Sequence, residues 1–391
     1  MKLTNLYATK SRWRKGLLLT LSATAALAIV LPVQEQAHAN AVQSQSSISV
    51  QNQRAAVKQA VENGANLPHI PGIVAVELKN GQRQAYAAGE SSVHDAQMIK
   101  VENAFRIGSI TKTFTAVVLL QLAGENKLSL DDSVEKWLPG VVQGNGYDGS
   151  QITIRQLLNH TSGVANYTDL EFINKYAQNR YQSFTPQKLI QEGLKHAPYF
   201  TPGTGWNYSN TNYVLAGLVI EKVTGETYGD QVQQRILTPL QLTRTYVPDH
   251  TSYIPWSHAR GYMYQAGQFH DVTEINPSFV FAAGDMISTV DNLNTFFQAL
   301  LSGKVLNRSQ LEEMFTVVDT GYGIHYGLGI MEQMLPNGQS IWGHGGSIDG
   351  WASYAGGSKG GNHVIAANMN VLSFEDVENP IITIIETAFA Q

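Results

Sequence analysis

The sequence of 391 residues contains no cysteine, which excludes several kinds of chemistry. Disulfide bonds, thiol nucleophiles, CxxC metal sites and iron–sulfur clusters cannot form, so stability must come from packing. Charged residues are sparse at 15%, and the formal net charge is −5. An acidic balance argues against nucleic acid and anionic lipid as partners. Hydrophobic residues make up 43% of the chain, which is enough for a sizeable core.

Long hydrophobic runs are also missing, with one exception near the N-terminus. Residues 16–31 read GLLLTLSATAALAIVL, follow five basic residues and precede Ala37–Ala39, which has the small-x-small form of a signal peptidase site. We therefore expect residues 1–39 to be a secretory signal peptide and the mature protein to be secreted and extracellular. An uncleaved N-terminal anchor is the alternative.

Removal of this segment changes the formal net charge from −5 to −9, because five basic residues and one acidic residue leave with it. No later run has the length of a membrane span.

The remaining sequence divides by its patterns into three parts. Residues 40–65 begin Gln/Ser-rich without periodicity, which predicts a flexible linker or propeptide, although a helical pattern follows within this range. Strand patterns occur at both ends of the rest, two of them around the turn Asn80-Gly81. Helical patterns dominate between these ends. We predict an α/β fold of the α+β type, with an α/β domain from residues 66–135 and 277–391 and a mainly helical domain from residues 136–276.

The stretch RIGSITKTFTAVVLLQL, residues 106–122, opens an apolar helix with a serine and a lysine three residues apart. Residues at i and i+3 share a helix face, so the Ser109 hydroxyl would lie beside the Lys112 amine. Burial would lower the pKa of Lys112, and the amine could then take the serine proton. The alternative is that Ser109 is an ordinary N-cap. The same spacing at Ser133–Lys136 lies in a charged, amphipathic stretch, which is typical of a solvated helix face.

A second segment supplies groups that a serine nucleophile needs. Tyr208 and Asn210 lie in PGTGWNYSNTNYVLAG, just before a helical pattern, and form the only Tyr-x-Asn of the chain. A phenol near a lysine can transfer protons, and an asparagine side chain can donate to and accept from a substrate amide. A packed aromatic residue and an N-cap asparagine are the alternative interpretation.

The third segment is WGHGGSIDGW, in which His344, Gly345 and Gly346 lie on a predicted strand. The missing side chains would let a substrate backbone dock against the strand edge, and His344 could supply a tunable positive charge. A single histidine is more often structural, however. Similar tripeptides occur at Lys79–Gly81, His325–Gly327 and Lys359–Gly361.

In this order, the three segments resemble the signature of the serine penicillin-recognising enzymes, which are the DD-peptidases, the serine β-lactamases and their esterase and D-peptidase relatives. The motifs match at 109–112, 208–210 and 344–346, and the likeness covers most of the chain from about residue 66, including ITIRQLLNHTSG. Secreted D-Ala-D-Ala carboxypeptidases and D-stereospecific peptidases look most similar. The resemblance implies a β-lactamase/transpeptidase-like fold, no metal, no organic cofactor, and β-lactams as covalent ligands.

The resemblance also implies roles for individual residues. The catalytic roles fall to Ser109 as the nucleophile that forms an acyl-enzyme, Lys112 as its activating base and Tyr208 as the proton relay. The residues that contact the substrate are Asn210, His344, Gly345, Gly346 and Ser347. Within this second set, Asn210 holds the acyl-side amide and His344 helps to position the ligand's negative end. The N–H group of Ser347 is expected to complete an oxyanion hole with that of Ser109.

One position departs from the family pattern. Carboxypeptidases of this type carry an arginine just after the YGLG motif to bind the terminal carboxylate, and Met331 occupies that position here. Gly345, the middle residue of the third motif, also lacks the side-chain hydroxyl that family members often carry at that position. We therefore predict a secreted, monomeric serine DD-peptidase that leans toward D-stereospecific cleavage of internal bonds in D-amino-acid peptides or peptidoglycan stem peptides. A β-lactamase or esterase of the same fold is one alternative. A non-catalytic sensor of cell-wall peptides or β-lactams is the alternative from another class.

Overall fold

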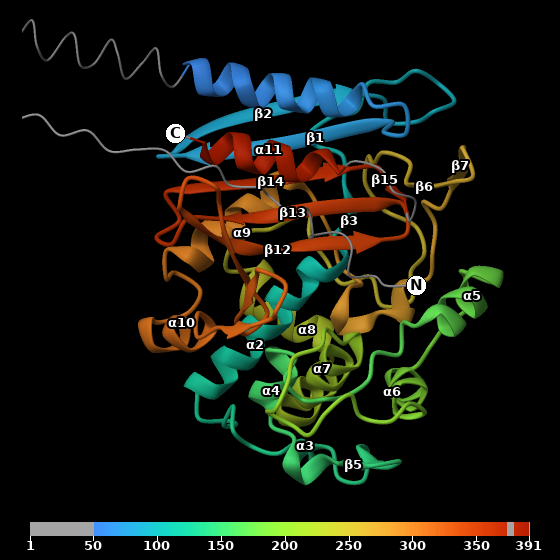
Figure 1. Cartoon of the computed structure of the whole chain (residues 1–391), viewed down its shortest axis with the longest axis vertical. Helices are drawn as coiled ribbons and strands as arrows, with labels where there is room; N and C mark the ends of the chain where they lie inside the picture. The colour runs from blue at the N-terminus through green and yellow to red at the C-terminus, as the bar shows by residue number, and fades with distance from the viewer. Residues whose placement is uncertain (1–50, 374–378, 391) are drawn as a thin grey trace, which may run out of the picture.

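The computed structural model describes residues 51–373 and 379–390 (Figure 1). The predicted signal peptide and the first part of the predicted linker lie outside the described residues. In Figure 1 a twisted sheet fills the upper half of the molecule and a group of helices fills the lower half. The mixed α/β class with an antiparallel sheet is therefore confirmed.

The main sheet has eight strands, and every neighbouring pair runs antiparallel. Strands from both ends of the chain meet in it, because the N-terminal hairpin pairs directly with a C-terminal strand. The tight turn of this hairpin places Asn80 and Gly81 at φ 51° and 76°, as an Asn-Gly turn requires. In sheet order the strands are β2 (Gln82–Gly89), β1 (Gly72–Lys79), β14 (His363–Met369), β13 (Trp351–Gly357), β12 (Ser340–Ile348), β11 (Met331–Met334), β10 (His325–Tyr326) and β9 (Val318–Asp319).

Helices cover both faces of the sheet. The helix over residues 51–65 and α11 (Pro380–Phe389) share one apolar core, to which the first helix contributes Val57 and Val61. On the other face, α9 (Val290–Leu301) packs against β1, β13 and β14. Residues 51–65 are thus part of the folded domain, which corrects the prediction of a linker for that stretch. The reason is the spacing of its valines, which places both on the buried face.

The helical half is built around two buried helices, α2 (Thr111–Gly124) and α7 (Asn210–Thr224), which contact each other below the sheet (Figure 1). The other helices of this half and of the connection to β9 are α3 (Val134–Trp137), α4 (Ile154–Leu158), α5 (Leu170–Gln178), α6 (Pro186–Leu194), α8 (Tyr228–Val232) and α10 (Arg308–Met314). Short 3-10 or π turns are η2 (Gly108–Ile110), η3 (Gly149–Gln151), η4 (Gln233–Leu237), η5 (Pro277–Phe279) and η6 (Phe281–Ala283).

Three smaller sheets accompany the main sheet in the described residues. The hairpin of β6 (Tyr262–Gln265) and β7 (Gln268–Asp271) pairs in parallel with β15 (Val371–Ser373). The last part of the predicted helical domain is therefore a hairpin tied to a C-terminal strand. Two-stranded pairs are formed by β3 (Phe105–Arg106) with β8 (Ile287–Ser288) and by β4 (Gln143–Gly144) with β5 (Tyr147–Asp148).

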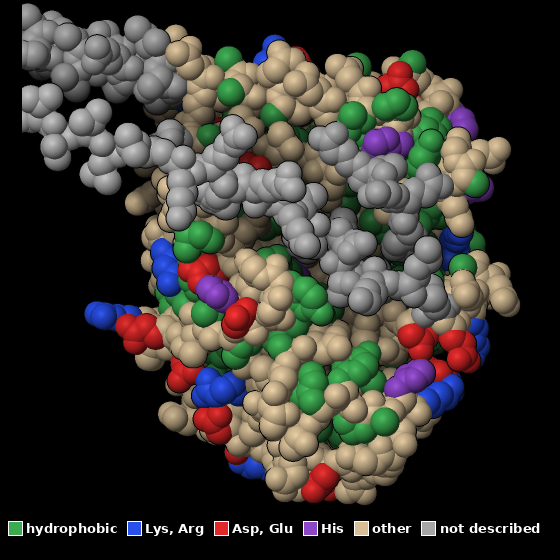
Figure 2. Space-filling model, in the orientation of Figure 1, with side chains coloured by type: hydrophobic (Ala, Val, Ile, Leu, Met, Phe, Trp, Pro, Cys, Tyr) green, Lys and Arg blue, Asp and Glu red, His purple; other side chains and the backbone are tan. Residues whose placement is uncertain are grey.

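The surface carries charges of both signs in alternation. Figure 2 shows acidic and basic side chains next to one another at several places on the viewed face. Ion pairs of the structure include Arg155–Asp131 and Arg308–Glu312. Among the described residues, no helix combines the length and the apolar character that crossing a membrane requires.

Glycines bring the sheet into contact with the turn that precedes α2. A Cβ atom on Gly346 would lie 2.0 Å from the carbonyl oxygen of Ile107, and one on Gly108 would lie 2.9 Å from the nitrogen of Ser347. Gly108 also has a φ of +50°, in the left-handed region. β11 pairs with β12 only from Ser340 to Gly343, so residues 344–348 of β12 extend beyond that pairing. β12 also contacts the turn η2. The predicted nucleophile turn and the predicted substrate strand therefore lie side by side.

Candidate active site

Ser109 lies in the 3-10 turn η2 and does not cap a helix. The N-cap residues of η2 and α2 are Ile107 and Ile110, and neither end has a side-chain cap hydrogen bond. By contrast, the Ser133 hydroxyl does accept from the N–H of Lys136, as a true N-cap does. The structure thus separates the two Ser-x-x-Lys matches in the way that the sequence indicated. Ser109 is half-buried, so its hydroxyl lies at the edge of the protein interior.

Lys112 is fully buried, and its amine lies among three oxygen atoms. Its Nζ atom is 2.7 Å from Oδ1 of Asn210, 2.7 Å from the carbonyl oxygen of Ala283 and 3.1 Å from Oγ of Ser109. The first two oxygens can only accept hydrogen bonds. A neutral amine has two N–H groups and one lone pair. When the N–H groups donate to Asn210 and Ala283, the lone pair is left for the Ser109 hydroxyl.

The protonation state of Lys112 fits this arrangement. Burial holds the pKa of Lys112 well below its usual value, because a charged ammonium loses its hydration in the interior. A neutral amine beside a serine hydroxyl is a general base within hydrogen-bond reach. The predicted pairing of Ser109 with Lys112 is therefore present in the geometry.

A closed ring of hydrogen bonds fixes the orientation of the Asn210 side chain. Nδ2 of Asn210 donates to Oγ1 of Thr168 at 3.0 Å, and the Thr168 hydroxyl donates to Oδ1 of Asn166 at 3.0 Å. The same Asn166 oxygen accepts from the backbone N–H of Asn210 at 3.0 Å. Since Nδ2 must face Thr168, Oδ1 must face Lys112. The Asn210 oxygen is therefore directed at the lysine, and one Nδ2 hydrogen is directed at Thr168.

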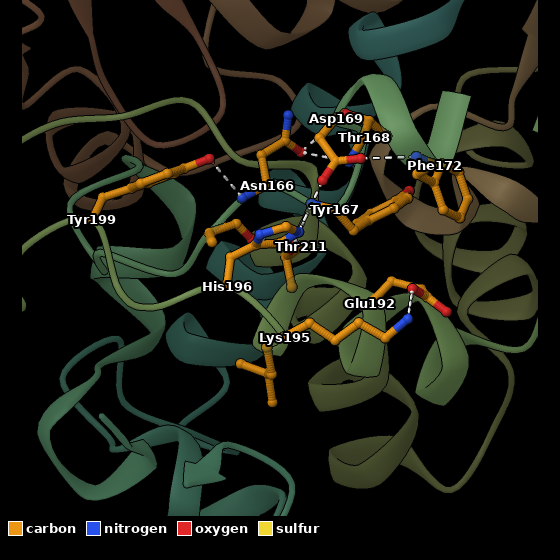
Figure 3. Close-up of polar contacts among 12 residues, drawn as sticks. Asn166, Tyr167, Thr168, Asp169, Phe172, Glu192, Lys195, His196, Tyr199 and Thr211 are labelled. Atoms are coloured by element: carbon orange, nitrogen blue, oxygen red, sulfur yellow. Dashed lines mark hydrogen bonds and ion pairs between the residues drawn. The ribbon is translucent and has the colours of Figure 1, made fainter. Parts of the chain in front are cut away.

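Figure 3 shows how the segment that carries Asn166 and Thr168 is held. The backbone N–H of Asn166 donates to the hydroxyl of Tyr199 at 3.1 Å, and the N–H of Tyr167 donates to Thr211 at 3.2 Å. Asp169 caps α5, because its Oδ1 atom accepts from the backbone N–H of Phe172. Its Oδ2 atom lies 2.8 Å from Nε2 of His196. Contacts from α5, α7 and the 195–199 loop thus hold the partners of Asn210 in place.

Tyr208 lies between the lysine and the strand β12. Its ring centroid is 4.9 Å from Nζ of Lys112 and 6.4 Å from the ring of His344. The ring of His160 lies against it at 4.3 Å. The structure therefore brings all three predicted segments together, with the Tyr208 ring beside both the Lys112 amine and the His344 ring.

His344 is neutral, which corrects the expectation that it supplies a positive charge. The residue is fully buried, and burial, with a smaller effect of Lys112, lowers its pKa to about 3. Its Nδ1 atom is 2.6 Å from the carbonyl oxygen of Gly345, which can only accept, so Nδ1 carries the proton. Nε2 then accepts from the hydroxyl of Tyr326 at 2.9 Å. The sequence could not reveal this state because it depends on complete burial.

His160 is a member of the site that the sequence analysis did not assign. It is fully buried, and its Nδ1 accepts from the backbone N–H of Ser209 at 3.2 Å. Its carbonyl oxygen accepts from the N–H of Asn207 at 3.1 Å. These two bonds hold the loop on both sides of Tyr208. Residues 159–163, NHTSG, belong to a stretch that the family resemblance already included. However, nothing in this stretch indicates that His160 holds the loop around Tyr208.

Three residues that were expected to contact the substrate differ in their exposure. Gly346 is buried against Ile107, Gly345 is half-buried, and Ser347 is exposed next to Gly108. This places the backbone of Ser347 beside the nucleophile turn, where an oxyanion hole would need it. In the part of the chain that the structure describes, no group of three or more His, Asp or Glu side chains is placed to hold a metal ion.

Comparison with known proteins identifies the family of the chain. A family model described as Beta-lactamase matches residues 57–388. The chain belongs to this family. With the geometry around Ser109, it is a serine hydrolase of the β-lactamase and penicillin-binding-protein type.

Several relatives are known. A D-stereospecific amidohydrolase from Streptomyces sp. has 44% identity and a TM-score of 0.79, over 86% of this chain and 98% of that chain. A D-amino acid amidase from Ochrobactrum anthropi SV3, complexed with L-phenylalanine amide, has 26% identity and a TM-score of 0.75, over 86% of this chain and 96% of that chain. Penicillin-binding protein 4* from Bacillus subtilis is 31% identical over 69% of this chain, but the match spans only 60% of that relative.

The buried amine leads to a prediction about stability. The unfolded chain keeps Lys112 protonated up to its usual pKa of about 10.4, whereas the folded chain keeps it neutral down to the lowered pKa. Between these two pKa values the unfolded state binds one more proton, so the free energy of unfolding falls as pH falls, by about 1.4 kcal/mol per pH unit. The Lys112→Met variant lacks this contribution. Chemical denaturation from pH 10 downward is expected to show the wild type losing stability relative to the variant, and parallel profiles would contradict a buried neutral lysine.

The ring around Asn210 leads to a second prediction. Thr168→Val removes the hydroxyl that orients the Asn210 amide, and an unsatisfied buried polar group costs about 1–3 kcal/mol. We expect kcat/KM to fall about 5- to 100-fold, and Thr168→Ser to restore it. Thr316→Val is the matched control, since Thr316 is exposed just after α10 and its hydroxyl donates to the carbonyl oxygen of Glu312 in that helix. An equal loss in the control, or no recovery with serine, would show that Thr168 does not act through Asn210.

Proposed function

We propose that the chain is a secreted serine peptidase that cleaves amide bonds next to D-amino-acid residues through an acyl-enzyme on Ser109. The observation that carries this proposal is the buried Lys112 amine, with two carbonyl acceptors and the Ser109 hydroxyl around it. The similarity to a D-stereospecific amidohydrolase, at 44% identity, supports the choice of D-substrates. The signal-like N-terminal sequence supports secretion.

Acylation begins when Lys112 takes the proton of the Ser109 hydroxyl. The Oγ atom then forms a bond to the substrate carbonyl carbon, and the carbonyl electron pair moves to its oxygen. The N–H groups of Ser109 and Ser347 stabilise this oxyanion, and one such donor is typically worth about 3–4 kcal/mol. Asn210 donates its second Nδ2 hydrogen to the acyl-side carbonyl of the substrate.

The intermediate collapses when the carbon–nitrogen bond breaks and the electron pair stays on the leaving nitrogen. Tyr208 donates its hydroxyl proton to that nitrogen and regains a proton from the Lys112 ammonium. The product amine departs, and a water molecule takes its place. Deacylation repeats these steps with the water as nucleophile and Ser109 as leaving group.

The substrate preference follows from the strand next to the site. Met331 begins β11 and pairs with Gly343, the residue before His344. Neither Met331 nor the neutral His344 offers a positive charge for a terminal carboxylate. We therefore favour substrates whose leaving group lacks a free carboxylate, such as amides and internal peptide bonds.

A panel of peptides tests the reaction and its nucleophile together. We expect the wild type to hydrolyse N-acetyl-D-Ala-D-Ala amide and to leave the all-L peptide intact. Ser109→Ala is expected to lower kcat by at least about 10⁴-fold and to abolish covalent labelling by a fluorescent penicillin. Ser133→Ala, in the other Ser-x-x-Lys match, serves as the control and keeps full activity. Labelling that persists in Ser109→Ala refutes the nucleophile, and rapid penicillin turnover by the wild type identifies a β-lactamase instead.

Met331 gives a separate test of the substrate preference. Met331→Arg would place a guanidinium, which binds carboxylates in a bidentate manner, next to the leaving-group side. We expect the ratio of kcat/KM for the free acid N-acetyl-D-Ala-D-Ala to that for its amide to rise by tenfold or more. Met331→Gln, which has similar length without the charge, is the control. An unchanged ratio in the arginine variant would show that residue 331 does not face the leaving group.

A further inference from the structure

The leaving-group side of the site can be located from the proposed proton path. Tyr208 must reach the leaving nitrogen, whereas Asn210 contacts the acyl side. Groups that adjoin Tyr208 on the side of His344 therefore surround the part of the substrate that follows the cleaved bond. This step rests on the proposed function.

Aromatic rings form a continuous row on that side. The ring of Tyr326 lies 6.2 Å from that of Tyr208, and its hydroxyl bonds to His344. The ring of Trp206 lies 6.0 Å from Tyr326, and Tyr322 lies 6.2 Å from Trp206. The row runs from Tyr326, which is 1% exposed, to Tyr322, which is 56% exposed. It therefore connects the proton donor with the solvent.

The outer member of the row is held in place by its own turn. Tyr322 lies between Gly321 and Gly323, whose φ angles of 76° and 78° lie in the left-handed region. The Thr320 hydroxyl accepts from the N–H of Tyr322 at 3.2 Å and donates to the carbonyl of Ile324 at 2.7 Å. Single exposed tyrosines are common and need no special explanation. This one differs because its ring contacts Trp206, which in turn packs against the site.

The row has no charge of its own. Trp206 also packs edge-on against His160 at 6.1 Å, and burial lowers the pKa of both His160 and His344, so both rings are neutral. Aromatic faces bind apolar and aromatic groups, and such pairs contribute beyond the area that they bury. A free carboxylate gains nothing from these faces.

We infer that Trp206 and Tyr322 form a subsite that binds the apolar or aromatic side chain of the residue following the cleaved bond. The subsite would select peptides with a large apolar residue at that position over those with a small one. It would not affect simple amides, which release only ammonia and place nothing there.

The test uses three substrates with the same acyl group, N-acetyl-D-Ala, and different leaving groups: ammonia, alanine amide and phenylalanine amide. For the wild type we expect kcat/KM to be at least tenfold higher for the phenylalanine amide than for the alanine amide, with both enantiomers of each leaving group measured. In Trp206→Ala and Tyr322→Ala this ratio is expected to fall to threefold or less. For Tyr322→Ala, activity on the simple amide is expected to stay within twofold of the wild type. Trp206→Ala is assessed by its ratio alone, because Trp206 also packs against His160 and Tyr326.

Controls separate the possible failures. Tyr253→Ala removes a tyrosine that is also 56% exposed but lies outside the aromatic row, and it is expected to keep the wild-type ratio. Trp206→Phe keeps an aromatic face and is expected to retain most of the preference, which distinguishes lost binding from lost folding. A wild type that cleaves all three substrates without preference, or variants that lose activity on all three equally, overturn the subsite. A wild type that cleaves none and takes no penicillin label overturns the proposed function instead.

Discussion

The site depends on keeping one lysine amine neutral inside the protein. Burying an ammonium without a carboxylate partner is unfavourable, and the amine responds by losing its proton. The two carbonyl oxygens near Lys112 accept its N–H groups and so direct its lone pair at Ser109. A carboxylate in place of either oxygen would hold the amine in its charged form and remove the base. Among the residues that the structure describes, no carboxylate forms an ion pair with this amine, which suits its role as the proposed base.

This arrangement requires segments that are far apart in the chain. Ala283 comes from η6, Asn210 from the start of α7 and Ser109 from η2, and the main chain of β12 lies against η2 through Gly346 and Gly108. The contact distances leave no room for a Cβ at either glycine, so the strand can approach the nucleophile turn only with those residues. The approach of β12 to the turn that carries Ser109 is thus set by the packing of these two glycines.

The sequence was informative where function is carried by side-chain identity. Ser109, Lys112, Tyr208 and Asn210 were predicted from their spacing and order, and the structure places them close together. The antiparallel strands at both ends of the chain were predicted from their patterns and are confirmed. The carbonyl oxygen of Ala283 could not be found, because every residue has one and only the fold places it. The neutral state of His344 was missed for a related reason, since its charge depends on burial rather than on its neighbours in the sequence.

The two sides of the site differ in a way that suits proton transfer. On the acyl side, Asn210 and its partners Thr168 and Asn166 form a fixed ring of hydrogen bonds, so that side can orient a substrate without exchanging protons. On the other side, His344 is held as a neutral ring by Gly345 and Tyr326. With both Lys112 and His344 neutral at rest, the proton that moves is the one that Ser109 releases. In the proposed mechanism its path runs through Lys112 and Tyr208 to the leaving nitrogen, so that the reacting groups would return to their starting charge with each cleavage.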